Sequence, residues 1–345
     1  MKYGVRDLSN VKHERPGVYS SYDASTVVQI GGGGSTVGIA AKSAGGTVNT
    51  LYRITRQEEA VAAFGTDDLL TQLVRLLFLN GAGAVCAVPV EEDADYTEAL
   101  RILEAEENLP VMVCDSTALT VQDSIKTASE ARRERIAVLP GAAGTVSELA
   151  SRAAAINSER VVLAAPGSSD GVQAAAAVAG AIAAQQDPAV PLGGAVLGGL
   201  GDLTAQYSDN ELDVLIRGGV TPLERVGGQV SVVRGVTTRT KTGEASDMTW
   251  RELSTVLIIE EVIPAIRNSL RAKFQRAKNT AQSRGAVRAQ VILELEARVS
   301  REIIGSYENV IVSASEEEPT VCLVEFSFSV VHGMNQIWLT AHIKV

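Results

Sequence analysis

Between residues 85 and 185, short apolar runs alternate with amphipathic segments, and this alternation constrains the fold more than any other feature of the sequence. The apolar runs are continuous, which is typical of strands that are buried on both faces of a parallel sheet. The predicted strands are Val85–Val90, Pro110–Cys114, Arg135–Leu139 and Arg160–Ala165, and the predicted helices that follow them are Asp95–Glu107, Val121–Glu134, Val146–Asn157 and Val172–Gln185. The pattern predicts an α/β domain with helices on both faces of the sheet.

The residues before this stretch fit the same domain. A short strand at Thr26–Ile30, a glycine run at Gly31–Gly34 and a buried strand at Thr36–Ala41 precede helices at Gln57–Phe64 and Leu69–Asn80. The glycine run is neither a phosphate-binding loop, which needs a Lys before its Ser or Thr, nor a dinucleotide fingerprint, because Thr stands at the last glycine position. We interpret it as a flexible break.

The second half of the chain has a different pattern, typical of α+β structure. A loop at Pro188–Gly201 leads to predicted strands, an exposed polar stretch and long helices. Pro264 is expected to kink the helical region or to start a new helix. The elements expected here are strands Leu212–Ile216 and Gln229–Val233, the exposed stretch Gly235–Asp247, helices Glu252–Val262, Ala265–Gln282 and Val287–Ile304, and the strand Tyr307–Val312.

Two alternating runs end the sequence. In Val321–Val331 the apolar side chains alternate with Glu and Ser from Val324 on, and His332–Asn335 predicts a turn. In Gln336–Val345 one face carries Ile337, Leu339, Ala341, Ile343 and Val345. An apolar strand that finds no partner in its own sheet is an open edge, so we expect this strand to be donated to another subunit.

Composition excludes several classes of protein. The 345 residues carry a net charge of -10, which argues against nucleic-acid binding. We expect neither a signal peptide nor a membrane span. The three cysteines, Cys86, Cys114 and Cys322, are predicted to be buried free thiols, and together with only three histidines they predict no metal site and no cofactor.

One stretch resembles a catalytic motif. Gly167-Ser168-Ser169-Asp170-Gly171 matches the nucleophile elbow of serine hydrolases, with Ser169 between a predicted strand and a predicted helix, and His332 or His342 follows in a suitable chain order. Asp170 as a helix cap explains the same residues, and both histidines lie in the alternating C-terminal region. We therefore expect no enzyme, and we keep a hydrolase based on Ser169 as the alternative.

A charge asymmetry predicts a docking surface. From Val262 to Leu293 there are seven basic residues and no acidic one. Such a stretch in an acidic protein suggests electrostatic contact with an acidic partner, although a solvated helix paired with the chain's own acidic surface explains it as well. Ile266, Leu270 and Phe274 would anchor the helix. The basic residues are Arg267, Arg271, Lys273, Arg276, Lys278, Arg284 and Arg288, and Arg267, Arg271 and Lys278 are expected to share a helix face.

Several motifs, in order, resemble contractile phage tail sheath proteins, a family that includes the sheaths of R-type bacteriocins and related injection systems. They are Arg15-Pro16-Gly17-Val18-Tyr19, Thr36-Val37-Gly38-Ile39-Ala40 with Arg53-Ile54-Thr55 and Ala63-Phe64-Gly65, Asn80-Gly81-Ala82-Gly83-Ala84-Val85, and Met248-Thr249-Trp250-Arg251-Glu252-Leu253. The family's usual Trp-Gly-Pro stretch is replaced by Lys42-Ser43-Ala44-Gly45-Gly46.

The resemblance implies a structural function. Sheath subunits stack as hexameric rings around an inner tail tube, and contraction drives the tube through the target cell envelope. The implied partners are the same chain, the tube protein, and the baseplate and terminator proteins. The implied location is a virion tail or tail-like particle that is assembled in the host cytoplasm, without nucleic-acid contact or membrane insertion.

The resemblance also divides the chain. It implies an extended N-terminal arm at residues 1–25, an α/β sheath domain at 26–210, an α+β domain facing the tube at 211–334 and a strand arm at 335–345. The expected tube contacts are Arg267, Arg271, Lys273, Arg276 and Lys278. The residues expected to exchange strands between subunits are Val18, Tyr19, Ile337, Leu339, Ala341, Ile343 and Val345.

Overall fold

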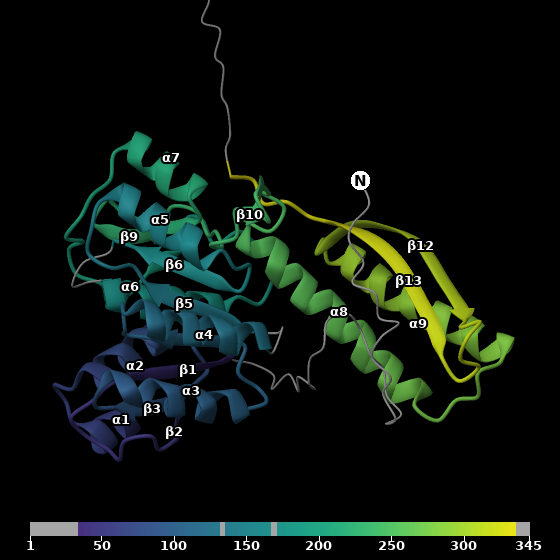
Figure 1. Cartoon of the computed structure of the whole chain (residues 1–345), viewed down its shortest axis with the longest axis horizontal. Coiled ribbons are helices and arrows are strands. Elements are labelled where there is room, and N and C mark those ends of the chain that lie inside the picture. The colour runs from purple at the N-terminus through teal and green to yellow at the C-terminus, as the bar shows by residue number, and fades with distance from the viewer. Residues whose placement is uncertain (1–33, 132–134, 167–170, 336–345) are drawn as a thin grey trace, which may run out of the picture. The chain divides into compact units, whose positions relative to one another are not determined.

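The computed structural model describes residues 34–131, 135–166 and 171–335 (Figure 1). The chain divides into two compact units. Of the described residues, the sheet unit comprises those between 34 and 256 and residues 332–335, and the hairpin unit comprises residues 257–331. The predicted strand at Thr26–Ile30 lies outside the described residues. No helix in the described part of the chain has both the length and the apolar character to cross a membrane.

A mixed sheet forms the centre of the sheet unit, in the order β2-β3-β1-β4-β5-β6-β8-β9-β7. The strands from β3 to β8 in this order are parallel, whereas β2, β9 and β7 join antiparallel at the two edges. The parallel core confirms the predicted α/β architecture. The strands are β1 Thr36–Lys42, β2 Tyr52–Ile54, β3 Ala84–Val90, β4 Val111–Cys114, β5 Ile136–Pro140, β6 Val161–Ala165, β7 Val196–Leu197, β8 Val220–Val226 and β9 Gln229–Val232.

Helices cover both faces of this sheet, as predicted. On one face α6 lies along β4, β5 and β6 with α2 beside it. On the other face, side chains of α3, α4, α5 and α7 form one apolar core with the sheet. The helices of the sheet unit are α1 Gln57–Phe64, α2 Leu69–Leu79, α3 Tyr96–Ala105, α4 Leu119–Ala131, α5 Val146–Ile156, α6 Gly171–Ala184 and α7 Asp209–Arg217.

Helix α6 is apolar on every side, and most of its residues are buried. Its sequence, Gly-Val-Gln-Ala-Ala-Ala-Ala-Val-Ala-Gly-Ala-Ile-Ala-Ala, is almost entirely small. Small side chains let the helix backbone lie close to both the sheet and α2. Near Gly180, an added Cβ would lie 2.7 Å from the carbonyl oxygen of Leu77 in α2. The core is therefore filled by close backbone approach rather than by aromatic rings, consistent with the 4% aromatic content.

Two glycines bring the start of β1 against the turn before β3. A Cβ at Gly34 would lie 1.9 Å from the carbonyl oxygen of Gly81, and a Cβ at Gly83 would lie 1.8 Å from that of Gly34. The amide of Gly83 also donates to the carbonyl of Ser35 at 3.1 Å. The last residue of the glycine run therefore has a packing role, and the same contact accounts for the small residues of the Asn80–Val85 motif.

One predicted strand, Leu212–Ile216, is wrong. These residues belong to α7, which begins after a capping box in which Ser208 and Glu211 bond each other's backbone amides. Leu215 is buried, whereas Val214 is exposed. The short apolar run reflects one turn of an amphipathic helix, and the strand that follows it is β8, which the prediction missed.

The hairpin unit consists of helices packed on two antiparallel strands. Its elements are α8 Leu253–Phe274, which begins in the sheet unit, α9 Ala281–Ser300, β12 Ile304–Ala314 and β13 Cys322–Val330. Helix α9 packs on β12. Pro264 lies inside α8 and does not start a new helix. The chain instead breaks between Phe274 and the N-cap Thr280, so the predicted helix to Gln282 is wrong.

Replacing Gly83 with Ala tests the close approach. We expect Gly83→Ala to lower the free energy of unfolding by about 2–3 kcal/mol, because the new methyl group would overlap the backbone of Gly34. The matched control is Gly285→Ala in α9, where a Cβ would meet open space. The control should gain about 1 kcal/mol from helix propensity. Chemical denaturation of both variants measures the difference, and equal effects would contradict the packing role.

Candidate assembly surfaces

Exposed cations gather at the end of α8 and in the loop that follows. Arg271, Lys273, Arg276 and Lys278 are exposed, and we call residues 271–278 the basic segment. Of the three predicted anchors of this helix, Ile266 and Leu270 are buried, whereas Phe274 at the helix end is only half-buried. Lys273 Nζ donates to Gln290 Oε1 in α9 at 2.6 Å. The basic segment therefore exposes positive charge at the end of α8. The buried residues Ile266 and Leu270 hold that helix in place.

The structure separates Arg267 from the other predicted contacts. Its residue is 7% exposed, so it does not belong to the open surface. Because α8 ends at Phe274, Lys278 lies in the loop and does not share a helix face with Arg267 and Arg271. The expected common face is therefore wrong. The cause is the helix end, which neither a proline nor a glycine marks in the sequence.

Two other cations of this region bind within the hairpin unit. Arg284 Nη1 donates to Asn279 Oδ1 at 3.0 Å, and Arg288 Nε donates to the carbonyl of Val310 at 2.8 Å. Asn279 in turn donates to the carbonyls of Pro319 and Val321. These bonds tie the α8–α9 loop to the turn between β12 and β13, so the basic segment has a defined position within its unit.

The strand pair β12–β13 forms a second candidate surface. In β13 the exposure alternates as predicted, with Val324, Phe326, Phe328 and Val330 less exposed than their neighbours. Within the described residues β12 and β13 pair only with each other, so each strand has one unpaired edge. Such edges accept further strands. The strand-exchange residues Val18, Tyr19, Ile337, Leu339, Ala341, Ile343 and Val345 all lie outside the described residues.

The cysteine prediction holds for two of three residues. Cys86 and Cys114 are buried, and burial raises the pKa of the Cys114 thiol to about 12. Cys322, at the start of β13, is exposed. The expectation of a buried thiol there is wrong, because Cys322 is the first residue of β13 and lies at the end of a strand pair that buries little.

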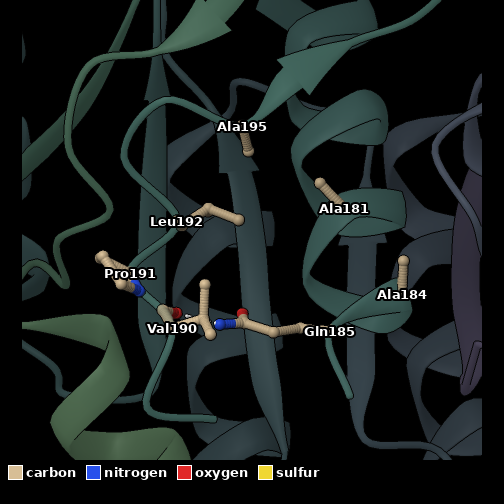
Figure 2. A pocket seen from close by; sticks show the side chains of 7 residues that line it. All are labelled: Ala181, Ala184, Gln185, Val190, Pro191, Leu192 and Ala195. Carbon is tan, nitrogen blue, oxygen red and sulfur yellow. Dashed lines mark hydrogen bonds between the residues drawn. The ribbon is translucent and has the colours of Figure 1, made fainter. Parts of the chain in front are cut away.

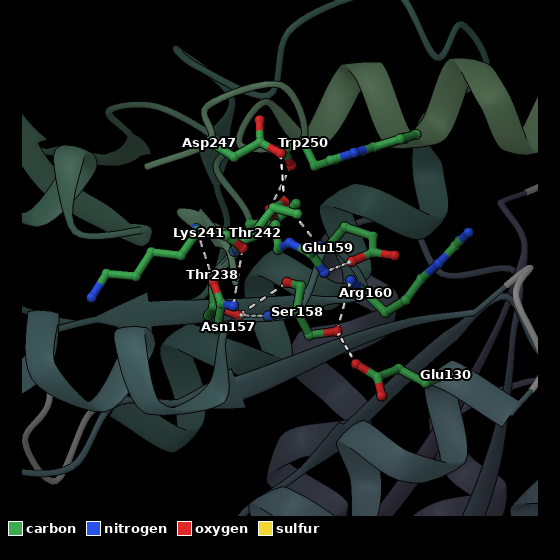
Figure 3. Close-up of polar contacts among 12 residues, drawn as sticks. Glu130, Asn157, Ser158, Glu159, Arg160, Thr238, Lys241, Thr242, Asp247 and Trp250 are labelled. Atoms are coloured by element: carbon green, nitrogen blue, oxygen red, sulfur yellow. Dashed lines mark hydrogen bonds and ion pairs between the residues drawn. The ribbon is translucent and has the colours of Figure 1, made fainter. Parts of the chain in front are cut away.

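A polar network holds the segment that leads into α8 (Figure 3). Thr238 Oγ1 accepts from the amide of Ser158 and donates to its carbonyl, both at 3.0 Å, and both residues are fully buried. The amide of Thr238 donates to the carbonyl of Val161 at 2.8 Å. The predicted exposure of Gly235–Asp247 is therefore wrong for its first half, because these threonines satisfy the backbone at the α5–β6 corner.

Asn157 extends this network from the end of α5. Its backbone is left-handed, with φ of 42°, a conformation that Asn tolerates better than most residues. Its Oδ1 accepts from the amides of Thr240 and Lys241, each at 3.1 Å, and its Nδ2 donates to the carbonyl of Lys241 (Figure 3). The side chain of Asn157 thus satisfies backbone groups of residues 240 and 241, as a neighbouring strand would otherwise do.

Two charged contacts complete the junction. Arg239 pairs with Glu159 at 3.0 Å. Asp247 accepts from the hydroxyl of Thr242 at 2.6 Å and from the amide of Thr249 at 3.0 Å. The Thr242 hydrogen bond is the main reason that the pKa of Asp247 falls to about 2. We call the segment from residue 236 to residue 250 the junction, and the bonds from Asn157, Ser158, Glu159 and Val161 fix it to the α5–β6 corner of the sheet unit.

The carboxyl end of the parallel sheet carries the half-buried carboxyl group of Asp115. Ligands often bind there, where strand order reverses, and in this sheet the reversal lies at β1 and β4. Asp115 accepts from the hydroxyl of Tyr96 and, at 3.1 Å, from the amide of Lys42. Burial raises the pKa of this carboxyl. Both carboxyl oxygens are bonded internally, and the described residues contain no metal-ligand cluster.

The hydrolase alternative gains no support. Ser169 lies in the stretch 167–170, outside the described residues, and so does His342. His332 is exposed, in the coil after β13.

Two family models match the chain. The phage tail sheath protein central domain matches residues 91–238, and the phage tail sheath C-terminal domain matches residues 245–344. The chain belongs to the phage tail sheath protein family. The boundary between the two matches falls inside the junction. No curated protein matches the chain.

Solved structures share the fold of this sheath protein. The sheath tail protein of Desulfitobacterium hafniense is 11% identical, with a TM-score of 0.72 over 95% of this chain and 100% of that chain. The anti-feeding prophage helical sheath in the contracted state is 13% identical, with a TM-score of 0.70 over 99% and 100%. A chain of the anti-feeding prophage baseplate structure is 15% identical, with a TM-score of 0.72 over 97% and 100%.

Thr238→Val tests the junction. Valine keeps the shape of threonine but leaves the buried amide of Ser158 without its acceptor, so we expect the free energy of unfolding to fall by about 2–3 kcal/mol. Thr120→Val, on the exposed start of α4, is the matched control and should change stability by less than about 0.5 kcal/mol. Urea denaturation followed by circular dichroism measures both. A Thr238→Val chain as stable as the control would refute the anchoring role.

Proposed function

We propose that this chain polymerises as stacked hexameric rings around an inner tail tube and contracts to drive the tube through a target envelope. The observation that carries the proposal is the match of both sheath domains over most of the chain. The fold shared with a helical sheath in its contracted state supports it. In this function the protein acts by assembly, without catalysis or a cofactor.

Strand exchange links the subunits in this proposal. The arms at residues 1–25 and 335–345 of neighbouring chains add to the open edges of the β12–β13 pair. Val18 and Tyr19 lie on one arm, and Ile337, Leu339, Ala341, Ile343 and Val345 lie on the other. Main-chain hydrogen bonds would give affinity, and the half-exposed apolar face around Phe326 and Phe328 would receive alternate side chains. Links of this kind keep subunits connected while they rotate.

The basic segment faces the tube in this proposal. Arg271, Lys273, Arg276 and Lys278 contact an acidic tube surface, while Arg267, which is buried, positions α8 rather than touching the tube. The α+β domain expected at residues 211–334 would face the tube. The particle assembles in the host cytoplasm with baseplate and terminator proteins. In this proposal the extended sheath is held kinetically until contraction is triggered. Contraction would then replace weak contacts with the tube by contacts between sheath subunits.

Deleting residues 337–345 tests strand exchange. We expect the truncated chain to lose polymerisation but to keep a folded sheet unit, because the deleted residues lie outside the described core. Negative-stain electron microscopy of the purified chain gives the first result, and circular dichroism gives the second. A control chain with Ile337 and Leu339 changed to Val keeps the apolar face and should still form tubes. Normal tubes from the truncated chain would sink the strand-donor proposal.

Reversing charge on the basic segment tests tube contact. Arg271→Glu with Lys278→Glu should impair assembly on the tube more than assembly of the sheath alone, since the reversed charges repel an acidic tube. The control is Arg75→Glu with Lys241→Glu, which reverses two exposed charges on the sheet unit. Co-sedimentation with purified tubes at two salt concentrations measures the effect. Equal losses in both assemblies, or in the control, would exclude this docking role.

A further inference from the structure

An apolar pocket opens at the end of α6 (Figure 2). It has a volume of about 170 Å³ and lies between the last turn of the helix and the segment 190–195. Ala181, Ala184, Leu192 and Ala195 contribute methyl and isobutyl groups to its wall. Gln185 is its one polar side chain, and Gln185 Nε2 is bonded to the carbonyl of Val190. The wall therefore offers little to a polar ligand.

The size and exposure of the pocket favour an aliphatic occupant. Val190 at its rim is 54% exposed, so an apolar occupant of the pocket would remove part of its surface from water. A dry protein cavity of about 150 Å³ suffices for a molecule as large as benzene. The pocket therefore fits one or two aliphatic side chains.

The described chain begins beside this pocket. The amide and the hydroxyl of Ser35 both donate to the carbonyl of Ala183, at 2.8 and 2.9 Å. Ala183 is the direct neighbour of Ala184 in the pocket wall. The residues before Ser35 are four glycines, Gly31–Gly34, and before them Val27-Val28-Gln29-Ile30. Five residues span at most about 18 Å, which is enough to return from Ser35 to the pocket.

We propose that Val28 and Ile30 of the same chain fill this pocket. Alternation along a short strand places Val28 and Ile30 on one side and Gln29 on the other. The glycines permit the reversal of direction that this path needs. With Val28 and Ile30 in the pocket, the C-terminal end of the N-terminal arm would be held against α6. Val18 and Tyr19 precede this attachment in the sequence.

Two other occupants are conceivable, and the choice between them rests on the chain path. Gly333 packs on Pro191 at the rim, where an added Cβ would lie 2.7 Å from Pro191 Cγ, so the chain after Asn335 also starts nearby. That segment has no glycine run to turn it back into the pocket. A second copy of the chain would have to supply Val28 and Ile30 without the short tether that Gly31–Gly34 provides.

Disulfide trapping in the full-length chain distinguishes these occupants. Cys322→Ser removes the exposed native thiol, and Cys86 and Cys114 are buried. Ile30→Cys is combined with Ala184→Cys, or with Ala181→Cys in case the first pair does not fold. The controls are Gln29→Cys with Ala184→Cys, and Ile30→Cys with Gln186→Cys, which is exposed outside the pocket wall. After mild oxidation, non-reducing electrophoresis reports the bond, which forms only at short Cα separations.

We expect Ile30→Cys with Ala184→Cys to give a disulfide-bonded monomer of altered mobility. The yield of this band should not depend on protein concentration. Both controls should lack the band. Equal yields in the controls would overturn the proposal, since a loosely moving segment reacts with every position. A disulfide-linked dimer would assign the pocket to a second copy. A bond from Ile337→Cys to Ala184→Cys, with none from Ile30→Cys, would assign it to the C-terminal segment. Because no outcome depends on tube formation, the result is independent of the proposed function.

Discussion

The hydrogen bonds between Thr238 and Ser158 hold the segment between the two matched sheath domains against the α5–β6 corner. Both side chains are fully buried, and each hydrogen bond between them replaces one that water can no longer supply. Asn157 and Arg239 extend the anchor from the same corner of the sheet. The central-domain match ends at residue 238 and the C-terminal match begins at residue 245, so the chain passes between them while held to β6.

The parallel core was predictable because its signal is local. Continuous apolar runs such as Val161–Ala165 can be buried on both faces only in a covered sheet, and polar caps such as Asp68 mark where helices begin. The failures share a cause. In α7 the apolar run Val214-Leu215-Ile216, together with Leu212, looked like a strand, whereas in the structure these residues follow a capping box and only Leu215 of them is fully buried. In the junction, threonines looked exposed because their partners are far away in the sequence.

The candidate surfaces were predictable to a smaller extent. A run without acids located the exposed cations Arg271, Lys273, Arg276 and Lys278. The sequence did not reveal that Arg267 is buried or that Arg284 and Arg288 bind carbonyl and amide oxygens, because these facts depend on how α8, α9 and β12 pack. Charge along a sequence locates a surface, but only packing tells which charges stay available to a partner.

The sheet unit and the hairpin unit of this sheath protein differ in how completely their apolar residues are covered. The sheet unit is closely packed where glycines meet the backbone of a neighbouring segment, as at Gly34 and Gly83. The hairpin unit keeps a two-stranded sheet whose apolar face is only half covered and whose edges are open within the described residues. A two-stranded sheet is marginally stable alone, so additional strands would stabilise it. If neighbouring chains supply such strands, as we propose, the hairpin unit would gain stability while the buried core of the sheet unit stays unchanged.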